Sequence, residues 1–175
     1  MHPILFELGP FTIRSYGACI ALAFIVGFYL LEKEAKRRDF YPGKILDLGL
    51  WVIASGVLGA RLLHVLVNLS YYGANPLEIF LFWKGGLAIY GGLILGILAG
   101  VVFIRKRGMA FFSTADLFAP YLALGQAIGR IGCFLNGCCF GKVGLFYPAQ
   151  LSAASLLLII FVILRLMRNL KVSPG

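Results

Sequence analysis

The stretch DLFAPYLALGQAIGRIGCFLNGCCFGK, residues 116–142, opens with a mostly apolar run that carries one arginine, Arg130, inside it. A helix needs about 20 mainly apolar residues to cross the hydrocarbon core of a bilayer. The whole chain has 175 residues, 61% of them apolar, and a mean hydropathy of +0.92. Because a soluble domain is usually about 45–50% apolar, this excess predicts an integral membrane protein.

Five apolar runs are long enough to cross a bilayer. They cover about residues 15–31, 45–67, 86–104, 116–135 and 150–166. The sequence therefore predicts an all-α, polytopic membrane helix bundle of about five transmembrane helices, and residues 1–175 as a single integral membrane domain. No basic stretch precedes the first run, so no cleavable signal peptide is predicted. Glycines four residues apart, as at Gly92, Gly96 and Gly100, predict close packing between helices.

The distribution of basic residues predicts the orientation. The chain has 16 basic and 7 acidic residues, a net charge of +9. Basic clusters occupy residues 32–44, 105–108 and 165–171, whereas residues 70–85 hold one lysine and several aromatic side chains. The positive-inside rule then places the N-terminus outside and the C-terminus in the cytoplasm. Basic clusters in short loops between apolar runs indicate anionic lipid headgroups as partners rather than nucleic acid.

Two arginines fall inside predicted spans, and both map to the outer half of the bilayer. Arg61 and Arg130 each lie well past the midpoint of a span that starts in the cytoplasm. An arginine at the bilayer centre costs about 2.5–3.5 kcal/mol, so such residues usually face a cavity and have a partner. Each could cap a neighbouring helix or pair with Glu7 or Glu78. We expect at least one to bind an anionic ligand, a phosphate above all, because guanidinium matches phosphate bidentately.

Further polar residues map to the same outer level. They are Arg14, Tyr16, His64, Tyr90, Asn136 and Gln150. His64 lies three residues after Arg61, which places both on one helix face. Together these groups predict a wet pocket that opens toward the outer leaflet.

The four cysteines carry no obvious chemistry in their spacing. Cys133, Cys138 and Cys139 lie close together in sequence and Cys19 is remote, which matches no common metal pattern. No metal site is therefore predicted. A disulfide is possible on an oxidising side, although an adjacent pair rarely bonds to itself. The first interpretation of these cysteines is as small side chains.

Five ordered motifs carry a resemblance to a known family. They are HPILFELGPFTIRSYG, GARLLHVLVN, FWKGGLAIYGGLILG, the stretch quoted first, and YPAQL. Over almost its whole length the chain resembles the prolipoprotein diacylglyceryl transferases, with GRIG-x-F-x-NG as the most specific part. The resemblance implies a multi-pass transferase of the bacterial inner membrane that acts in lipoprotein biosynthesis. Such an enzyme transfers diacylglyceryl from phosphatidylglycerol to the lipobox cysteine thiol of a prolipoprotein signal peptide, and glycerol 1-phosphate leaves. It implies no cofactor and no metal.

The resemblance also implies site residues. Arg130 matches the signature arginine, Arg61 the GAR arginine and Tyr16 the tyrosine of the first motif. Asn136 and Gly141 match the later signature positions, and Arg14 joins them in the predicted phosphatidylglycerol site. The predicted catalytic residues are Arg130, Tyr90 and His64.

The chain departs from the family at several positions. Tyr90 stands where the family commonly has a histidine proposed as base, and His64 where it often has tyrosine. The two could have exchanged roles, or His64 could be packed between helices. Cys133 and Cys138 replace an asparagine and an acid, and the family continues further beyond the fifth span. A non-catalytic phospholipid-binding protein on the same scaffold is therefore the alternative. A small transporter or channel fits less well, because the cytoplasmic halves of the spans are apolar.

Overall fold

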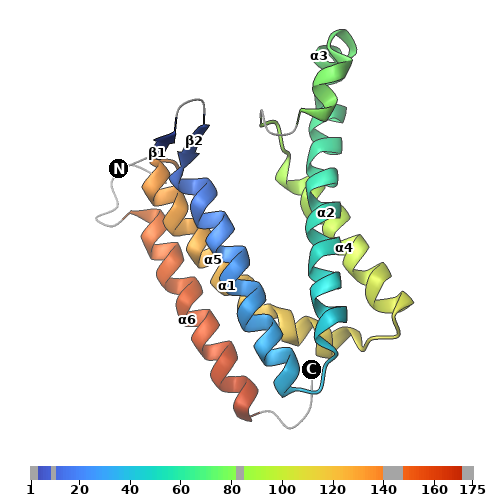
Figure 1. The fold of residues 1–175 in the computed structure, drawn as a ribbon, viewed down its shortest axis with the longest axis vertical. Helices are drawn as coiled ribbons and strands as arrows, with labels where there is room; N and C mark the ends of the chain where they lie inside the picture. The colour runs from blue at the N-terminus through green and yellow to red at the C-terminus, as the bar shows by residue number, and fades with distance from the viewer. Residues whose placement is uncertain (1–3, 9–10, 82–84, 140–147, 171–175) are drawn as a thin grey trace. The chain divides into compact units, whose positions relative to one another are not determined.

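The computed structural model describes residues 4–8, 11–81, 85–139 and 148–170. Five helices in these ranges are long and apolar enough to cross a membrane. They are α1 (Ser15–Arg37), α2 (Pro42–Val67), α4 (Ile89–Lys106), α5 (Phe111–Asn136) and α6 (Ala149–Leu170), drawn in Figure 1. The predicted all-α polytopic membrane fold is thereby confirmed.

The chain folds into two compact units. The first comprises Met1–Phe40 and Phe112–Gly175, and the second comprises Tyr41–Phe111. The first unit contains α1, α5, α6 and a short hairpin. The second contains α2 and α4, joined through the short helices α3 (Leu69–Ala74) and η1 (Pro76–Phe80).

The hairpin in front of α1 is a feature that the sequence analysis did not predict. Strand β1 (Ile4–Leu8) pairs antiparallel with β2 (Phe11–Arg14), with Leu8 opposite Phe11 and an irregular register between Ile4 and Phe6. Residues 11–14 read Phe-Thr-Ile-Arg, an apolar–polar alternation typical of a strand with one covered face. Hydropathy alone does not detect so short an element.

Four of the five predicted spans lie inside the observed helices, whereas the third, 86–104, begins before α4 starts at Ile89; most helix ends extend beyond the predicted spans. Helix α1 continues to Arg37, where Lys36 pairs with Glu32 at 2.7 Å and Arg38 pairs with Glu34 at 2.9 Å. Such pairs four residues apart support an exposed helix end by about 0.3–0.5 kcal/mol each. Hydropathy marks where a helix is apolar enough for lipid, not where its backbone hydrogen bonds end.

Helices α2 and α4 pack backbone against backbone through glycines. The α-carbon of Gly59 lies against the carbonyl oxygen of Gly91, and that of Gly91 against the carbonyl of Gly59. A Cβ added at Gly92 would lie 2.9 Å from the carbonyl oxygen of Gly56. The predicted close packing is confirmed at Gly92, where a side chain would separate the helices, whereas a Cβ at Gly96 would make only ordinary contacts.

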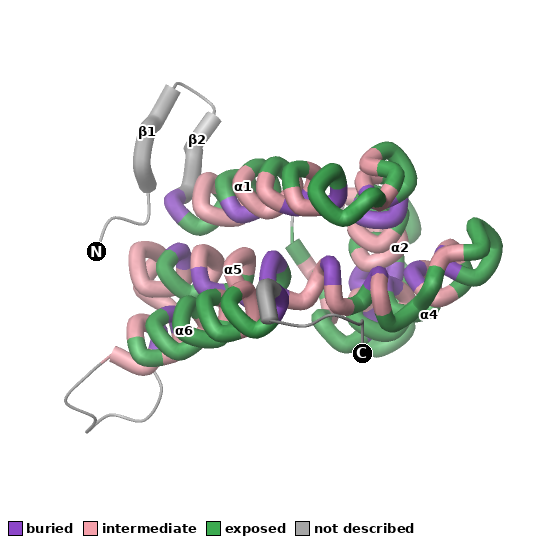
Figure 2. The backbone as a smooth tube through the Cα atoms, turned by 90° about the horizontal axis from the view of Figure 1, so that it is seen from below, coloured by how far each residue is buried: buried purple, intermediate pink, exposed green. Residues whose placement is uncertain are grey.

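In the first unit, α5 contacts both α1 and α6. A Cβ at Gly132 would lie 2.8 Å from Cβ of Cys19, and the Tyr121 and Phe161 rings lie 6.4 Å apart between centroids. Near the other end of α5, the buried Arg168 of α6 donates to the carbonyl of Asp116. Figure 2 shows long exposed faces along the helices, and apolar side chains such as Ile25, 68% exposed, lie on them. Such faces suit contact with lipid.

Candidate functional site

Arg61 anchors the segment that joins α2 to α4. Its Nε donates to the carbonyl oxygen of Ile79 at 2.9 Å, and its Nη1 donates to those of Gly85 at 2.8 Å and Gly86 at 2.9 Å. Its Nη2 donates to the carbonyl of Glu78. The side chain is buried, and four of the five N–H donors that an arginine offers are thus engaged by carbonyls of the described residues.

Two consecutive glycines, Gly85 and Gly86, precede α4 and adopt backbone conformations that other residues rarely adopt. Gly85 has φ +95° and Gly86 has φ +74°, both in the left-handed region. A Cβ on Gly86 would lie 2.7 Å from Nε2 of His64 and 2.8 Å from Nη1 of Arg61. The two glycines therefore let their carbonyls turn toward Arg61 while the backbone approaches His64.

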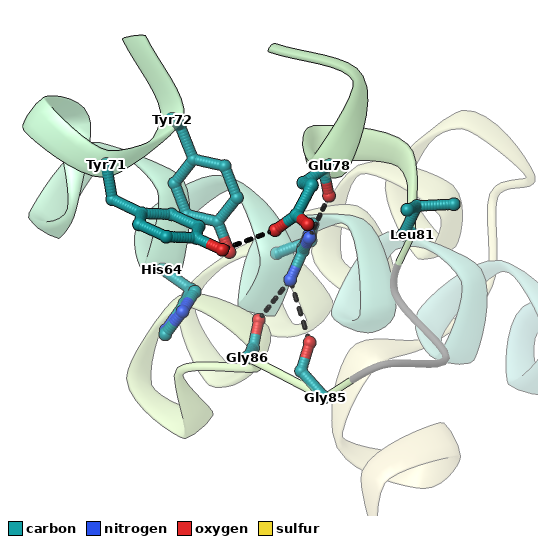
Figure 3. A pocket seen from close by; sticks show the side chains of 8 residues that line it. His64, Tyr71, Tyr72, Glu78, Leu81, Gly85 and Gly86 are labelled. Carbon is teal, nitrogen blue, oxygen red and sulfur yellow. Dashed lines mark hydrogen bonds between the residues drawn. The ribbon is translucent and has the colours of Figure 1, made fainter. Parts of the chain in front are cut away.

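A pocket of about 340 Å³ opens beside this arginine (Figure 3). Its walls are Arg61, His64, Tyr71, Tyr72, Glu78, Leu81, Gly85 and Gly86. The His64 and Tyr72 rings meet edge to face with centroids 6.0 Å apart, and Cζ of Arg61 lies 5.2 Å from the centroid of Tyr72. The prediction that Arg61 and His64 share one face is confirmed, since both line this pocket.

Tyr71 and Glu78 form a hydrogen bond at the rim of the pocket. The Tyr71 hydroxyl donates to Oε2 of Glu78 at 2.6 Å. The bond to this carboxylate, more than the charge of Glu78, raises the pKa of Tyr71 above its ordinary value of 10.0. The sequence analysis did not assign Tyr71 or Tyr72 to a site, since aromatic side chains in an outer loop fit an interfacial belt equally well.

Arg130 lies in a different setting, toward the C-terminal end of α5. Its side chain is exposed and makes no hydrogen bond or ion pair with any residue that the structure describes. The hydroxyl of Tyr16, at the start of α1, interacts electrostatically with Arg130 and with the three thiols of Cys133, Cys138 and Cys139. Asn136 ends α5 six residues later, about 9 Å along the helix axis.

The turn after α5 is fixed by polar contacts. The side chain of Gln150, fully buried at the start of α6, donates through Nε2 to the carbonyl oxygen of Cys138 at 2.7 Å. A hydrogen bond from the Asn136 side chain lowers the pKa of the Cys138 thiol, because it stabilises the thiolate. The sequence analysis assigned Asn136 and Gln150 to the same outer level, and the hydrogen bond from Gln150 to Cys138 now joins the start of α6 to the end of α5.

Other predicted site residues lie apart from these contacts or outside the described part. Tyr90 is in the first turn of α4, 72% exposed, and does not line the Arg61 pocket. Arg14 ends β2, and its side chain is not among those described; Gly141 lies outside the described residues. Arg61, His64 and Tyr90 belong to the second unit, and Tyr16, Arg130 and Asn136 to the first. One pocket shared by all of them stays a prediction.

Comparison with known proteins identifies the family. The family described as prolipoprotein diacylglyceryl transferase matches residues 3–174. The chain belongs to this family.

Three curated relatives show the extent of the similarity. All three are named phosphatidylglycerol–prolipoprotein diacylglyceryl transferase. The chain is 44% identical to that of Trichormus variabilis over 140 residues, which is 80% of this chain and 50% of the relative. It is 40% identical to that of Bacillus licheniformis over 136 residues, 78% of this chain and 50% of the relative. It is 39% identical to that of Streptococcus agalactiae over 142 residues, which is 81% of this chain and 55% of the relative. The chain thus spans about half the length of the curated relatives it matches.

Proposed function

We propose that the chain carries out, in the outer half of a bacterial inner membrane, the transfer of diacylglyceryl from phosphatidylglycerol to a lipobox cysteine of a prolipoprotein. The proposal is supported by its membership of the diacylglyceryl transferase family and by the names of relatives about 40% identical to it. In this reaction the cysteine sulfur attacks the glyceryl carbon and forms a C–S bond. The C–O bond to phosphate breaks, and glycerol 1-phosphate leaves with the electron pair.

The proposed orientation has the N-terminus outside and the C-terminus in the cytoplasm. It rests on the basic segments at residues 32–44, 105–108 and 165–171. In this orientation the Arg61 pocket, Arg130 and Asn136 all belong to helix ends on the outer side. Substrate lipid and prolipoprotein signal peptide would then reach them from the outer leaflet.

The observation that carries the proposal is the exposed guanidinium of Arg130, which makes no hydrogen bond with the described residues and lies within electrostatic reach of Tyr16. A guanidinium can hold a phosphodiester bidentately and stabilise the charge that develops on the leaving phosphate. We assign this role to Arg130, with Tyr16 and Asn136 as polar partners of the headgroup. Arg14 and Gly141 are proposed in the same headgroup site from the family resemblance alone.

Arg61 is better suited to positioning than to holding a phosphate. Four of its donors are engaged by backbone carbonyls, so bidentate phosphate binding would release contacts to the Gly85–Gly86 turn. We propose that Arg61 fixes this turn, and that the phosphate-binding role first predicted for it falls to Arg130.

The substrate thiol must lose its proton, since the thiolate is the nucleophile. His64 is the better candidate base, because its imidazole lines the Arg61 pocket, whereas Tyr90 is outside that lining. We therefore propose His64 as the acceptor of the proton and Tyr90 as a hydrogen-bonding group for lipid or peptide.

The test is a transfer assay with the purified chain in nanodiscs that contain phosphatidylglycerol. A lipobox peptide is added and glycerol phosphate release is measured. The thioether adduct on the peptide is detected by mass spectrometry. We expect both products from the unmodified chain and neither from Arg130→Gln. Arg165→Gln, which removes one positive charge from α6 in the same unit, is the matched control and should retain activity.

Two outcomes would replace the proposal. If the chain binds phosphatidylglycerol but releases no glycerol phosphate, a non-catalytic lipid-binding role is correct. If Arg130→Gln and Arg165→Gln have equal activity, the headgroup is held elsewhere. A His64→Ala variant with full activity would remove His64 from the mechanism and leave the rest intact.

A further inference from the structure

Three cysteine sulfurs meet where α5 ends. The Sγ atoms of Cys133, Cys138 and Cys139 all lie within 4.8 Å of one another. Cys133 and Cys138 are half-buried and Cys139 is exposed, so the group is open on one side. The proposed transfer reaction uses none of these thiols, because its nucleophile belongs to the substrate peptide.

The backbone, rather than the spacing in sequence, brings these sulfurs together. Cys133 is in the last turn of α5, and the helix ends at Asn136. Gly137 and Cys139 then adopt left-handed conformations, with φ +74° and φ +63°. A non-glycine residue in this region is uncommon and costs of order 1–3 kcal/mol. This turn carries Cys138 and Cys139 back toward Cys133.

Two contacts hold the group in this arrangement. Sγ of Cys138 lies 3.6 Å from the carbonyl oxygen of Cys133, and Nε2 of Gln150 donates to the carbonyl of Cys138 at 2.7 Å. Oε1 of the same fully buried Gln150 has no hydrogen-bond partner among the described residues. The side chain that fixes the Cys138 carbonyl therefore keeps an acceptor oxygen that no described residue engages.

The distances suit a metal ion bound by thiolates. A zinc–sulfur bond is about 2.3 Å, so three sulfurs on a tetrahedral zinc ion lie about 3.8 Å apart. The observed sulfurs lie at most about 1 Å further apart than that spacing, a shift that side-chain rotation supplies. Soft thiolate ligands select ions such as Zn²⁺ over Mg²⁺ or Ca²⁺.

We propose that Cys133, Cys138 and Cys139 form a three-thiolate site for a zinc-type divalent ion, whose fourth ligand comes from outside the three cysteines. Binding releases the thiol protons, and no oxidation is involved. The ion ties the last turn of α5 to the turn that follows it. It thereby fixes the end of the helix that carries Arg130 and Asn136.

A disulfide is the competing use of the same sulfurs. Cys138 and Cys139 are adjacent in sequence, and such a pair rarely bonds to itself. A disulfide from Cys133 to either one would leave the third thiol unused. Because all three sulfurs lie within 4.8 Å of one another, the arrangement favours a metal ion bound by all three over a disulfide between two of them.

The experiment uses Co²⁺ as a spectroscopic probe for zinc. The purified full chain is reduced, the reductant is removed, and Co²⁺ is titrated while absorbance is recorded. Thiolate-to-cobalt charge-transfer bands in the near ultraviolet and tetrahedral d–d bands in the visible should saturate at one ion per chain, and Zn²⁺ should displace the cobalt. Cys133→Ser, Cys138→Ser and Cys139→Ser should each weaken binding at least about tenfold. Cys19→Ser, outside the group, is the matched control and should bind as the unmodified chain does.

The proposal fails if no charge-transfer band appears, or if the three serine variants bind cobalt as well as Cys19→Ser does. It also fails if peptide mapping finds Cys133 in a disulfide and the reduced chain takes up no metal. Circular dichroism of each variant shows that a loss of binding does not reflect unfolding. None of these readouts depends on transfer activity, so this test is independent of the proposed function.

Discussion

Arg61 and Gly86 are joined in two ways: Nη1 of Arg61 donates to the Gly86 carbonyl at 2.9 Å, and the same Nη1 would lie 2.8 Å from a Cβ on Gly86. The arginine therefore holds this turn and also leaves no room for a side chain on it. The buried Arg61 of α2 and the two glycines that precede α4 therefore belong to one set of contacts. The contact explains why Arg61 is tolerated in an apolar helix, because backbone carbonyls satisfy its guanidinium.

Substituting the two glycines separately should distinguish strain from collision. Gly85→Ala places a Cβ in open space at φ +95°, so only backbone strain of about 1–2 kcal/mol is expected. Gly86→Ala adds a collision with His64 and with the hydrogen-bonded Arg61. Thermal unfolding in detergent should show a clearly lower Tm for Gly86→Ala than for Gly85→Ala. Equal Tm values would contradict the crowding at Gly86.

Arg61→Lys should destabilise the segment that joins α2 to α4. A lysine ammonium is a point charge and cannot replace a planar fork that reaches carbonyls from Glu78 to Gly86. Each hydrogen bond to a charged group contributes about 1.5–3 kcal/mol, so we expect a loss of about 3 kcal/mol or more. Arg105→Lys, in the last turn of α4 in the same unit, is the matched control and should unfold within about 0.5 kcal/mol of the unmodified chain. Hydrogen exchange of residues 76–81 and 85–88 should quicken in Arg61→Lys alone; unchanged exchange would show that these residues do not depend on this arginine.

The sequence predicted the spans well because lipid imposes a simple requirement on them. Each membrane-crossing helix must satisfy its own backbone and present apolar side chains, and both demands are visible in hydropathy. That Arg61 and His64 lie on one helix face was likewise predictable from their spacing of three residues. The recurrence of Gly92, Gly96 and Gly100 predicted a glycine contact along α4, although the closest approach is at Gly91, outside that row.

Other parts of the site depend on backbone shape that hydropathy does not contain. The carbonyls that hold Arg61 belong to Glu78, Ile79, Gly85 and Gly86, and the two glycines among them adopt left-handed conformations. The three thiols approach one another because Cys139 adopts φ +63°, which no spacing rule predicts for a cysteine. The hairpin of residues 4–14 was missed because its strands are short and its signal is alternation instead of hydropathy.

The contact between α2 and α4 gives a third prediction. At Gly91 a Cβ would meet the carbonyl of Gly59 and Cβ of Leu63, which lie on the facing helix and cannot move far. Gly91→Ala should therefore force the helices apart and lower the Tm by many degrees or abolish folding. Gly96→Ala, five residues further along α4, places its Cβ at an ordinary 3.5 Å from the Val52 carbonyl and should be close to neutral. If both variants purify in equal yield with equal Tm, the close approach at Gly59 is not needed for stability.

The hydrogen bond between Tyr71 and Glu78 gives a pH-dependent prediction. It raises the pKa of Tyr71 above 10.0, so the protonated phenol is the form that stabilises the segment. That contribution is complete below about pH 10 and is lost as the pH rises through the raised value. The ultraviolet titration of the unmodified chain minus that of Tyr71→Phe reports this residue. In a Glu78→Gln background the same difference should move to lower pH, because the charged acceptor is gone; an unmoved curve would show that the carboxylate does not hold the phenol.

Substituting Arg130 should weaken lipid binding without lowering the stability of the fold, unlike substituting Arg61. Its guanidinium is exposed and makes no hydrogen bond with the described residues, so Arg130→Gln should change the free energy of unfolding by no more than about 0.5 kcal/mol. If it holds the lipid phosphate, the same change should weaken phosphatidylglycerol binding about ten- to a hundredfold, since a charge-assisted contact contributes about 1.5–3 kcal/mol. Arg130→Lys should recover part of the affinity but not the bidentate geometry. Binding is measured by tryptophan fluorescence quenching with a brominated phosphatidylglycerol, with Arg165→Gln as control. A large drop in Tm for Arg130→Gln, or affinity equal to that of Arg165→Gln, would show that Arg130 acts in folding or not at all.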